Sequence, residues 1–331
     1  MCNASIVRVR IAYQSGLRTL GIIAAGWLHL DREATGMMAS YGDLLLISDQ
    51  PALGFVGAGR AGTALALAFT DAGYPVTAVY SRTAVHAERV ARETGATICT
   101  SPADAARFSE VLFLTVPDDA VVSVTHNVAQ ARGFRSGAAV VHCSGALPLD
   151  VLNEAAACET LTGFFHPLQV LLGARSVRQL RGAFVGVDAG PELLPVLRTM
   201  AADLGATPVD VSDAARVPYH IAAVLAANYP FVLLSAASEL MQAAGISEEC
   251  SLESLLHLAR GSLNSLEALG PRAGLTGPIV RGDIATIARH LEYLREHQPT
   301  LLNMYRTLGL LVLEAAGDSF ARAKVRGELE R

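Results

Sequence analysis

The sequence predicts an α/β protein with a doubly wound, mostly parallel sheet, followed by an all-helical region. Short apolar runs alternate with helical patterns from residue 52 to 211, and a glycine-rich turn directly follows the first run. Beyond this stretch the strand-like runs stop and every long segment has helical spacing. We therefore expect an N-terminal extension over residues 1–50, an α/β domain over 51–211 and a helical domain over 212–331.

The expected strands are short and apolar: Leu53–Val56, Val76–Tyr80, Val111–Val116, Ala139–Cys143, Ala183–Val187 and Pro208–Val211. The helices expected between them are Ala61–Ala72, Ala84–Thr94, Pro102–Phe108, Asp119–Ala131 and Pro191–Leu204. The later helices are expected at Ser212–Gly245, Glu248–Leu269, Asp283–Glu296 and Pro299–Ala316, with a charged tail at Ala321–Arg331 that should fray. Short apolar strands joined by helices form parallel sheets covered on both faces.

The turn after the first expected strand has the pattern GxGxxG, formed by Gly57, Ala58, Gly59, Arg60, Ala61 and Gly62. Gly57 permits a sharp turn, Gly59 lets a pyrophosphate approach the backbone, and Gly62 lets the helix pack against the strand. The helix N-terminus adds free N–H groups and a partial positive charge. The strand–turn–helix context therefore predicts a dinucleotide-binding Rossmann domain.

The end of the second expected strand indicates which dinucleotide is bound. NAD-binding domains usually place an acidic residue there, to bind the ribose 2′-hydroxyl. This strand is followed instead by Ser81, Arg82 and Thr83. A guanidinium pairs well with a 2′-phosphate and the hydroxyls can donate to it. NADP is the expected cofactor, although Arg82 could also be an ordinary solvated arginine.

Two further strand ends should border the nicotinamide ribose, because ligands bind beyond the carboxyl ends of such strands. The first carries Thr115, Val116 and Pro117, and the second carries Ser144 and Gly145.

A histidine lies further on, in the segment 163–169. We expect this segment to be a loop, which makes His166 a candidate for function as well as for packing.

The junction between the two expected domains is rich in polar side chains. Arg216, Tyr219 and His220 share one face of a helix, although Pro218 could leave Arg216 just outside it. Arg216 could bind a substrate carboxylate, and Tyr219 or His220 could donate a proton. The alternative is a polar interface between domains. Further substrate-binding candidates are Asn228 and Arg281.

The composition is that of a globular protein. Of 331 residues, 51% are hydrophobic and 17% are charged, with a net charge of −5, which argues against a nucleic-acid partner. Lys324 is the sole lysine, so the body of the chain has none for acid catalysis. The cysteines show no metal-ligand spacing. We expect free thiols, a cytoplasmic location and no metal site.

Two apolar segments resemble membrane or targeting sequences. Val217–Ser238 reaches membrane-span length but contains His220 and Asn228, so we expect a helix of a bundle or dimer and no membrane partner. Leu17–Leu30 is too short to span a membrane. Residues 1–50 are expected to be a loosely ordered arm or the product of an upstream start codon, with a targeting peptide as the alternative.

The chain resembles the family of Rossmann-like proteins that carry a C-terminal domain of unknown function. The resemblance extends roughly from residue 52 to 317. It rests on GFVGAGRAGTALA, the Ser81-Arg82 strand end, LTVPDDAV, HCSGAL, FHPLQ, RVPYHIAAVLAAN and LTGPIVRGD. The last three stretches are not general features of dinucleotide-binding domains.

The family is similar in plan to pyrroline-5-carboxylate reductase, ketopantoate reductase, β-hydroxyacid dehydrogenases and deazaflavin reductases. Its helical domain is similar to the C-terminal domain of 6-phosphogluconate dehydrogenase. The resemblance implies NADP(H), hydride transfer and a homodimer built through the helical domain. Many β-hydroxyacid dehydrogenases and ketopantoate reductases use a catalytic lysine with an asparagine one helical turn later. Arg216 and His220 occupy comparable spacing here, which moves the expected proton donor to His220 or Tyr219.

The leading hypothesis is an NADPH-dependent oxidoreductase that reduces a small keto or imino acid, with Arg216 as anchor and His220 as acid. One alternative is a sensor or scaffold that binds NADP without turnover, which the missing lysine favours. Another is a deazaflavin-linked NADP reductase.

Overall fold

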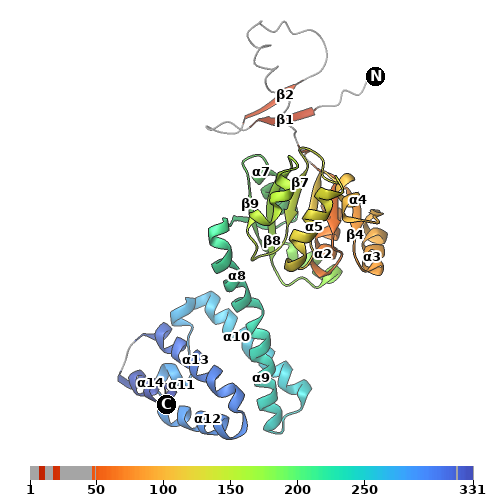
Figure 1. The fold of residues 1–331 in the computed structure, drawn as a ribbon. Helices are drawn as coiled ribbons and strands as arrows, with labels where there is room; N and C mark the ends of the chain where they lie inside the picture. The colour runs from red at the N-terminus through yellow and green to blue at the C-terminus, as the bar shows by residue number, and fades with distance from the viewer. Residues whose placement is uncertain (1–6, 12–17, 23–46, 49, 318–319, 331) are drawn as a thin grey trace, which may run out of the picture. The chain divides into compact units, whose positions relative to one another are not determined.

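The computed structural model describes residues 7–11, 18–22, 47–48, 50–317 and 320–330 (Figure 1). The chain forms two compact units, Met1–Asp49 and Gln50–Arg331. In the first unit, β1 (Val7–Ile11) pairs antiparallel with β2 (Arg18–Ile22), a pairing that the sequence did not predict. The expectations for the rest of residues 1–46 lie outside the described residues.

The second unit contains an eight-stranded sheet with the order β10-β9-β8-β7-β6-β3-β4-β5. All neighbouring strands are parallel except β8 and β9. The prediction of a mostly parallel, doubly wound sheet is therefore confirmed. The strands are β3 (Leu53–Val56), β4 (Val76–Tyr80), β5 (Thr97–Ile98), β6 (Val111–Leu114), β7 (Ala139–His142), β8 (Leu161–Leu168), β9 (Phe184–Ala189) and β10 (Thr207–Asp210).

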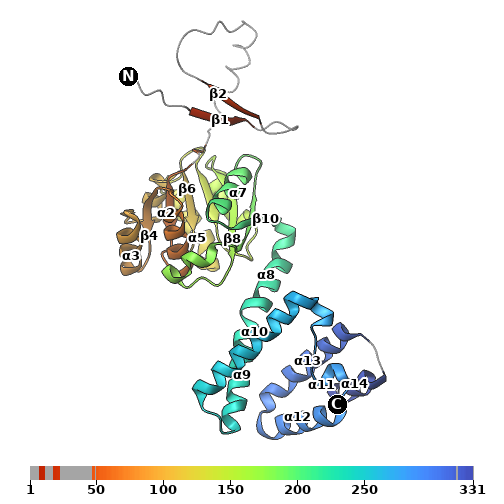
Figure 2. The same cartoon turned by 180° about the vertical axis from the view of Figure 1, so that it is seen from behind.

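Helices cover the sheet because both of its faces are apolar. They are α2 (Arg60–Asp71), α3 (Ala84–Thr94), α4 (Pro102–Arg107), α5 (Asp118–Gln130), α6 (Asn153–Ala156) and α7 (Leu194–Asp203), with 3-10 turns η1 (Leu149–Leu152) and η2 (Gly173–Leu180). On one face, Phe113 packs against Phe55, Phe69 and Phe165 with ring centroids 5.2–5.7 Å apart. Another core cluster joins Leu112, Leu114 and Val140 to residues of α4, α5 and α6. Figure 2 shows the same elements from behind.

The segment 163–169 differs from its prediction as a loop, because it belongs to strand β8. β8 pairs with β7 only as far as Phe164, opposite His142. Pro167 lies beyond that pair, where β8 has no β7 residue opposite it. The N–H group that proline lacks is therefore not needed for pairing with β7. The strand places the rings of Phe164 and His166 on the same face of the sheet, because side chains alternate.

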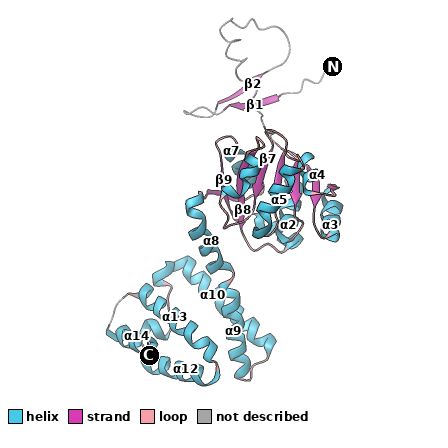
Figure 3. Cartoon of the chain, viewed as in Figure 1, coloured by secondary structure: helices cyan, strands magenta, loops and turns pink. Residues whose placement is uncertain are grey.

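Helices alone follow β10 in the described chain (Figure 3). They are α8 (Asp213–Ala227), α9 (Tyr229–Ala243), α10 (Glu248–Ala273), α11 (Pro278–Arg281), α12 (Ile284–His297), α13 (Pro299–Ala316) and α14 (Phe320–Glu330). The all-helical prediction is confirmed, but the fraying tail is not. Val325 and Leu329 of α14 are buried against Ile287, Leu291 and Leu313, so apolar packing stabilises this last helix.

Helices α8 and α9 are apolar but mostly uncovered. Among the described residues, Asp213–Ala243 is the single helical stretch long and apolar enough to cross a membrane, with a mean hydropathy of 1.7 over its most apolar window. Only 6% of that window is buried. The interpretation of this stretch as a bundle or dimer helix stays a prediction.

Candidate functional site

The glycine turn between β3 and α2 has the geometry that a dinucleotide site needs. Gly57 has φ +105°, a backbone conformation that favours glycine. A Cβ on Gly62 would lie 2.0 Å from the Gly57 carbonyl oxygen, so the helix could not approach the strand with any larger residue. A Cβ on Gly59 would meet nothing within 4 Å, which leaves open space where a pyrophosphate would bind.

Thr115 fixes this turn from the neighbouring strand. Its hydroxyl donates a 2.6 Å hydrogen bond to the carbonyl of Gly57. Thr115 therefore acts on the turn itself, and the sequence had assigned it only to the nicotinamide side. The next residues, Val116 and Pro117, lead into α5, whose first turn carries Asp118 and Asp119.

The end of β4 leaves its arginine accessible. Arg82 and Thr83 are exposed, and Ser81 is half-buried. In the part of the chain that the structure describes, Arg82 forms no ion pair. Its guanidinium is therefore free to meet a ligand phosphate.

A second group of predicted residues comes together where β7 ends. Ser144 accepts hydrogen bonds of 3.2 Å from the backbone N–H groups of Ala146 and Leu147, and so shapes the loop around Gly145. A Cβ on Gly145 would lie 2.8 Å from His220 Cδ2 and 2.9 Å from His166 Nε2. Any side chain at this position would have to displace one of the two imidazoles, a constraint that the sequence alone did not reveal.

Tyr219 completes what we call the histidine–tyrosine cluster, formed by Gly145, His166, Tyr219 and His220. Its hydroxyl lies 2.9 Å from Nδ1 of His166. A Cβ on Gly186 would be 2.9 Å from the same hydroxyl, so glycine on β9 makes room for the phenol. The rings of His166 and His220 have centroids 6.4 Å apart. Two half-buried imidazoles thus lie against Gly145, and the half-buried phenol of Tyr219 contacts one of them.

Burial sets the protonation of this cluster. Loss of water lowers the pKa of His166 to about 4, helped by the nearby His220 and opposed by the charge of Asp118. Burial raises the pKa of Tyr219 to about 12, with a hydrogen bond from the Gly186 backbone acting in the opposite direction. At neutral pH His166 is therefore uncharged and Tyr219 keeps its proton.

Arg216 is placed one helical turn before the cluster, inside α8 despite Pro218. Its side chain is only 1% exposed. Nη2 lies 2.9 Å from Asp188 Oδ2 and 3.0 Å from Asp213 Oδ1, and Nη1 donates to the carbonyl of Leu147 at 2.5 Å. The guanidinium carbon also lies 4.0 Å from the centroid of the Phe164 ring. These contacts favour a structural clamp between α8 and the sheet over the predicted substrate anchor.

His142 lies behind Arg216 at the end of β7. Its Nε2 is 3.3 Å from Nη1 of Arg216, and its Nδ1 is buried without a hydrogen-bond partner. Burial, the charge of Arg216 and nearby His166 together lower the pKa of His142 to about 3. A neutral imidazole next to the guanidinium accepts a hydrogen bond and adds no like charge.

The other predicted substrate residues lie elsewhere. Asn228 is exposed between α8 and α9, eight residues after His220, which corresponds to about 12 Å along a helix. Arg281 is exposed on α11, where its charge helps to lower the pKa of Asp283. Asp188 was missed by the sequence reasoning, since nothing in its β-strand context marked it as a partner of Arg216.

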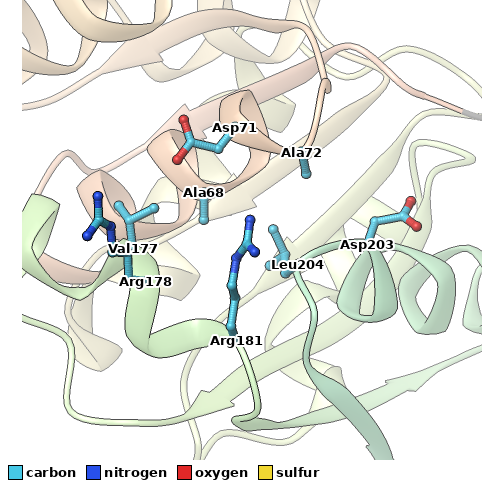
Figure 4. Close-up of a pocket in the computed structure, with 8 residues that line it drawn as sticks. All are labelled: Ala68, Asp71, Ala72, Val177, Arg178, Arg181, Asp203 and Leu204. Carbon is cyan, nitrogen blue, oxygen red and sulfur yellow. The ribbon is translucent and has the colours of Figure 1, made fainter.

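A hollow of about 410 Å³ lies apart from this cluster, at the C-terminal end of α2 (Figure 4). Arg181 points into it, between α2 and the end of α7. The phosphate turn begins the same helix, so the two sites are separated by the length of α2. Among the described residues, no group of three His, Cys, Asp or Glu side chains could hold a metal ion.

Comparisons with known proteins agree with this architecture. Residues 46–167 match the Rossmann-like domain, and residues 183–312 match the domain of unknown function DUF2520. No curated protein matches. The chain thus carries a Rossmann-like domain followed by a DUF2520 domain.

Solved structures show the same fold. A candidate NADP oxidoreductase from Bacteroides fragilis is 25% identical, with a TM-score of 0.70 over 80% of this chain and 99% of that one. The pyrroline carboxylate reductase of Plasmodium falciparum, solved with NADP bound, is 15% identical, with a TM-score of 0.55 over 84% and 98%. An imine reductase variant from Myxococcus stipitatus, solved with NAD+, is 18% identical, with a TM-score of 0.54 over 85% and 99%. The fold is shared with NAD(P)-dependent oxidoreductases.

Proposed function

We propose that this protein is an NADPH-dependent oxidoreductase that reduces the C=O or C=N bond of a small keto or imino compound. The observation that carries the proposal is the histidine–tyrosine cluster around Gly145, at the carboxyl end of β7. Ligands of doubly wound sheets bind beyond this edge, where the phosphate turn after β3 also lies. When bound, the dinucleotide supplies the hydride.

Different residues of the first domain would bind different parts of the cofactor. The open backbone at Gly59 and the N-terminus of α2 would bind the pyrophosphate. Arg82, with Ser81 and Thr83 beside it, would bind the 2′-phosphate of NADP. The loop of Ser144 and Gly145 would line the nicotinamide.

The cluster would orient the substrate and handle its proton. Tyr219 keeps its hydroxyl proton over the physiological range and can donate a hydrogen bond to a carbonyl oxygen or imine nitrogen. Its contact with His166 holds the phenol in place. His220 is the expected proton donor, because imidazole is the side chain suited to proton transfer near neutral pH.

NADPH oxidation over a panel of keto acids, imino acids and uncharged imines tests the proposal. We expect turnover of at least one class, and a loss of about 100-fold in kcat/KM for His220→Gln with unchanged NADPH affinity. His257→Gln, an exposed histidine of α10, is the matched control. No turnover by folded, NADPH-bound protein would contradict the enzyme proposal and favour the sensor alternative.

We also propose that the protein works as a homodimer in the cytoplasm, with the partner covering α8 and α9. The support is the apolar surface that these helices expose, including Ile221, Leu225, Phe231 and Val232, which are 54–78% exposed. Sedimentation should give twice the chain mass, and Phe231→Glu should shift the protein toward monomer.

A further inference from the structure

Carboxylates lie near the histidine–tyrosine cluster and near the arginine that precedes it on α8. Asp118, at the start of α5, is close enough to His166 for its charge to raise the pKa of that imidazole. Asp188 and Asp213 lie against Arg216, one turn of α8 before Tyr219. Two of these carboxylates share the guanidinium of Arg216, and Asp118 acts on His166. His142, His166 and Tyr219 carry no charge near neutral pH, so they do not offset the carboxylates.

The guanidinium of Arg216 is committed to the fold. Arg216 uses both terminal nitrogens on Asp188, Asp213 and Leu147, and its plane is covered by Phe164. A substrate carboxylate could reach it only by displacing one of these partners, so it would exchange one acceptor of the guanidinium for another and leave an aspartate without its counter-charge.

We propose that the substrate is a small imine without a carboxylate group, bound as its iminium cation. This inference rests on the proposed reductase function and narrows its substrate class. A cation gains from the field of Asp118 and of the acidic partners of Arg216, whereas an imino acid would bring a further negative charge to the same region.

An iminium substrate also accounts for the missing lysine. The two electrons of the hydride form the new C–H bond at the iminium carbon, and the C=N π pair becomes the lone pair of the product nitrogen. The dinucleotide is the reductant and is oxidised to NADP+. The substrate already carries its proton, so the hydride step requires no strong acid. For this substrate class His220 and Tyr219 accept the hydrogen bond of the iminium N–H group, and the loss expected for His220→Gln then reflects lost orientation of the substrate in place of lost proton transfer.

Matched ligand pairs test this inference without relying on turnover. Calorimetry on the NADP+-loaded protein should show pyrrolidine binding about tenfold more tightly than proline, since the two differ by a carboxylate. In NADPH oxidation, 1-pyrroline should exceed 1-pyrroline-2-carboxylate in kcat/KM by a similar factor. Stronger binding and turnover of the carboxylated members would overturn the inference and leave the reductase proposal intact. Binding and turnover of neither pair would overturn both.

A variant without the Asp118 charge tests whether this carboxylate causes the preference for the cationic ligand. Asp118→Asn removes the carboxylate near His166 and should reduce the pyrrolidine-to-proline ratio about threefold. Asp119→Asn, one residue further along the same exposed helical turn, is the matched control and should leave the ratio unchanged. NMR of the His166 imidazole gives a second readout, because its pKa should fall in Asp118→Asn only. Equal effects of the two variants would contradict the assignment.

Discussion

The phosphate turn and the histidine–tyrosine cluster lie at the same edge of the sheet but are built in different ways. The turn is local: Gly57, Gly59 and Gly62 lie within six residues, and Thr115 fixes them from the next strand. The cluster combines Gly145 after β7, His166 on β8 and Tyr219 on α8. The buried Arg216 holds α8 against the sheet through Asp188. A local backbone requirement is visible in a sequence, whereas a tertiary constellation is not.

The largest expected effect tests whether Arg216 is a clamp. Arg216→Met should lower the free energy of unfolding by about 2–4 kcal/mol, because the Leu147 carbonyl and His142 Nε2 would lose their hydrogen-bond donor and the partly exposed Asp188 and Asp213 would lose their counter-charge. Arg198→Met, which removes an exposed ion pair with Asp210, should cost no more than about 1 kcal/mol. Denaturant unfolding measures both. Similar small losses would show that Arg216 is free to act as a substrate anchor.

A smaller effect separates the glycines of the phosphate turn. Gly62→Ala should cost about 1–3 kcal/mol, because the new methyl group overlaps the Gly57 carbonyl. Gly59→Ala meets open space, so it should retain stability and lose NADPH affinity instead. Thermal unfolding and cofactor titration distinguish these results. Undiminished NADPH affinity in Gly59→Ala would contradict the placement of the pyrophosphate.

The pH dependence of stability tests the buried imidazole behind the cluster. The pKa of His142 falls from 6.5 to about 3 on folding, so below pH 6.5 the unfolded chain binds a proton that the native chain does not. The contribution of the neutral His142 to the free energy of unfolding should therefore be complete above pH 6.5. It should be lost progressively as the pH falls toward 3. His142→Gln should flatten the slope between pH 6 and 4 by up to about 1.4 kcal/mol per pH unit.

Denaturant unfolding of the wild-type protein and of His142→Gln at a series of pH values measures this difference. An unchanged slope in His142→Gln would show that this imidazole is not held neutral by the fold.

The smallest effect concerns cofactor choice. Arg82→Ala should weaken NADPH binding about tenfold and leave NADH binding nearly unchanged, since only the former carries a 2′-phosphate. Fluorescence titration with both dinucleotides measures the difference. Arg92→Ala, an exposed arginine on the next helix, controls for net charge. Equal losses of NADPH and NADH would assign Arg82 to another part of the nucleotide.

The sequence predicted the phosphate turn, the mostly parallel sheet and most helices because each depends on spacing over a few residues. It predicted a loop over residues 163–169 and missed β8. The point at which β7 stops pairing with β8 depends on both strands, so it cannot be predicted from the sequence of β8 alone. It placed Arg216 and His220 on one helix, which the structure contains. It could not foresee that Asp188, from an unrelated strand, would engage Arg216.

A crystal structure of the protein with NADP+ and pyrrolidine tests the central claim most directly. The account predicts the pyrophosphate over Gly57–Gly62, with the nicotinamide and the amine both near Gly145, between His166 and His220. Arg216 should retain its bonds to Asp188 and Asp213. An amine bound away from the cluster, or a nicotinamide ring directed away from Gly145, would contradict the assignment of this cluster as the reducing site.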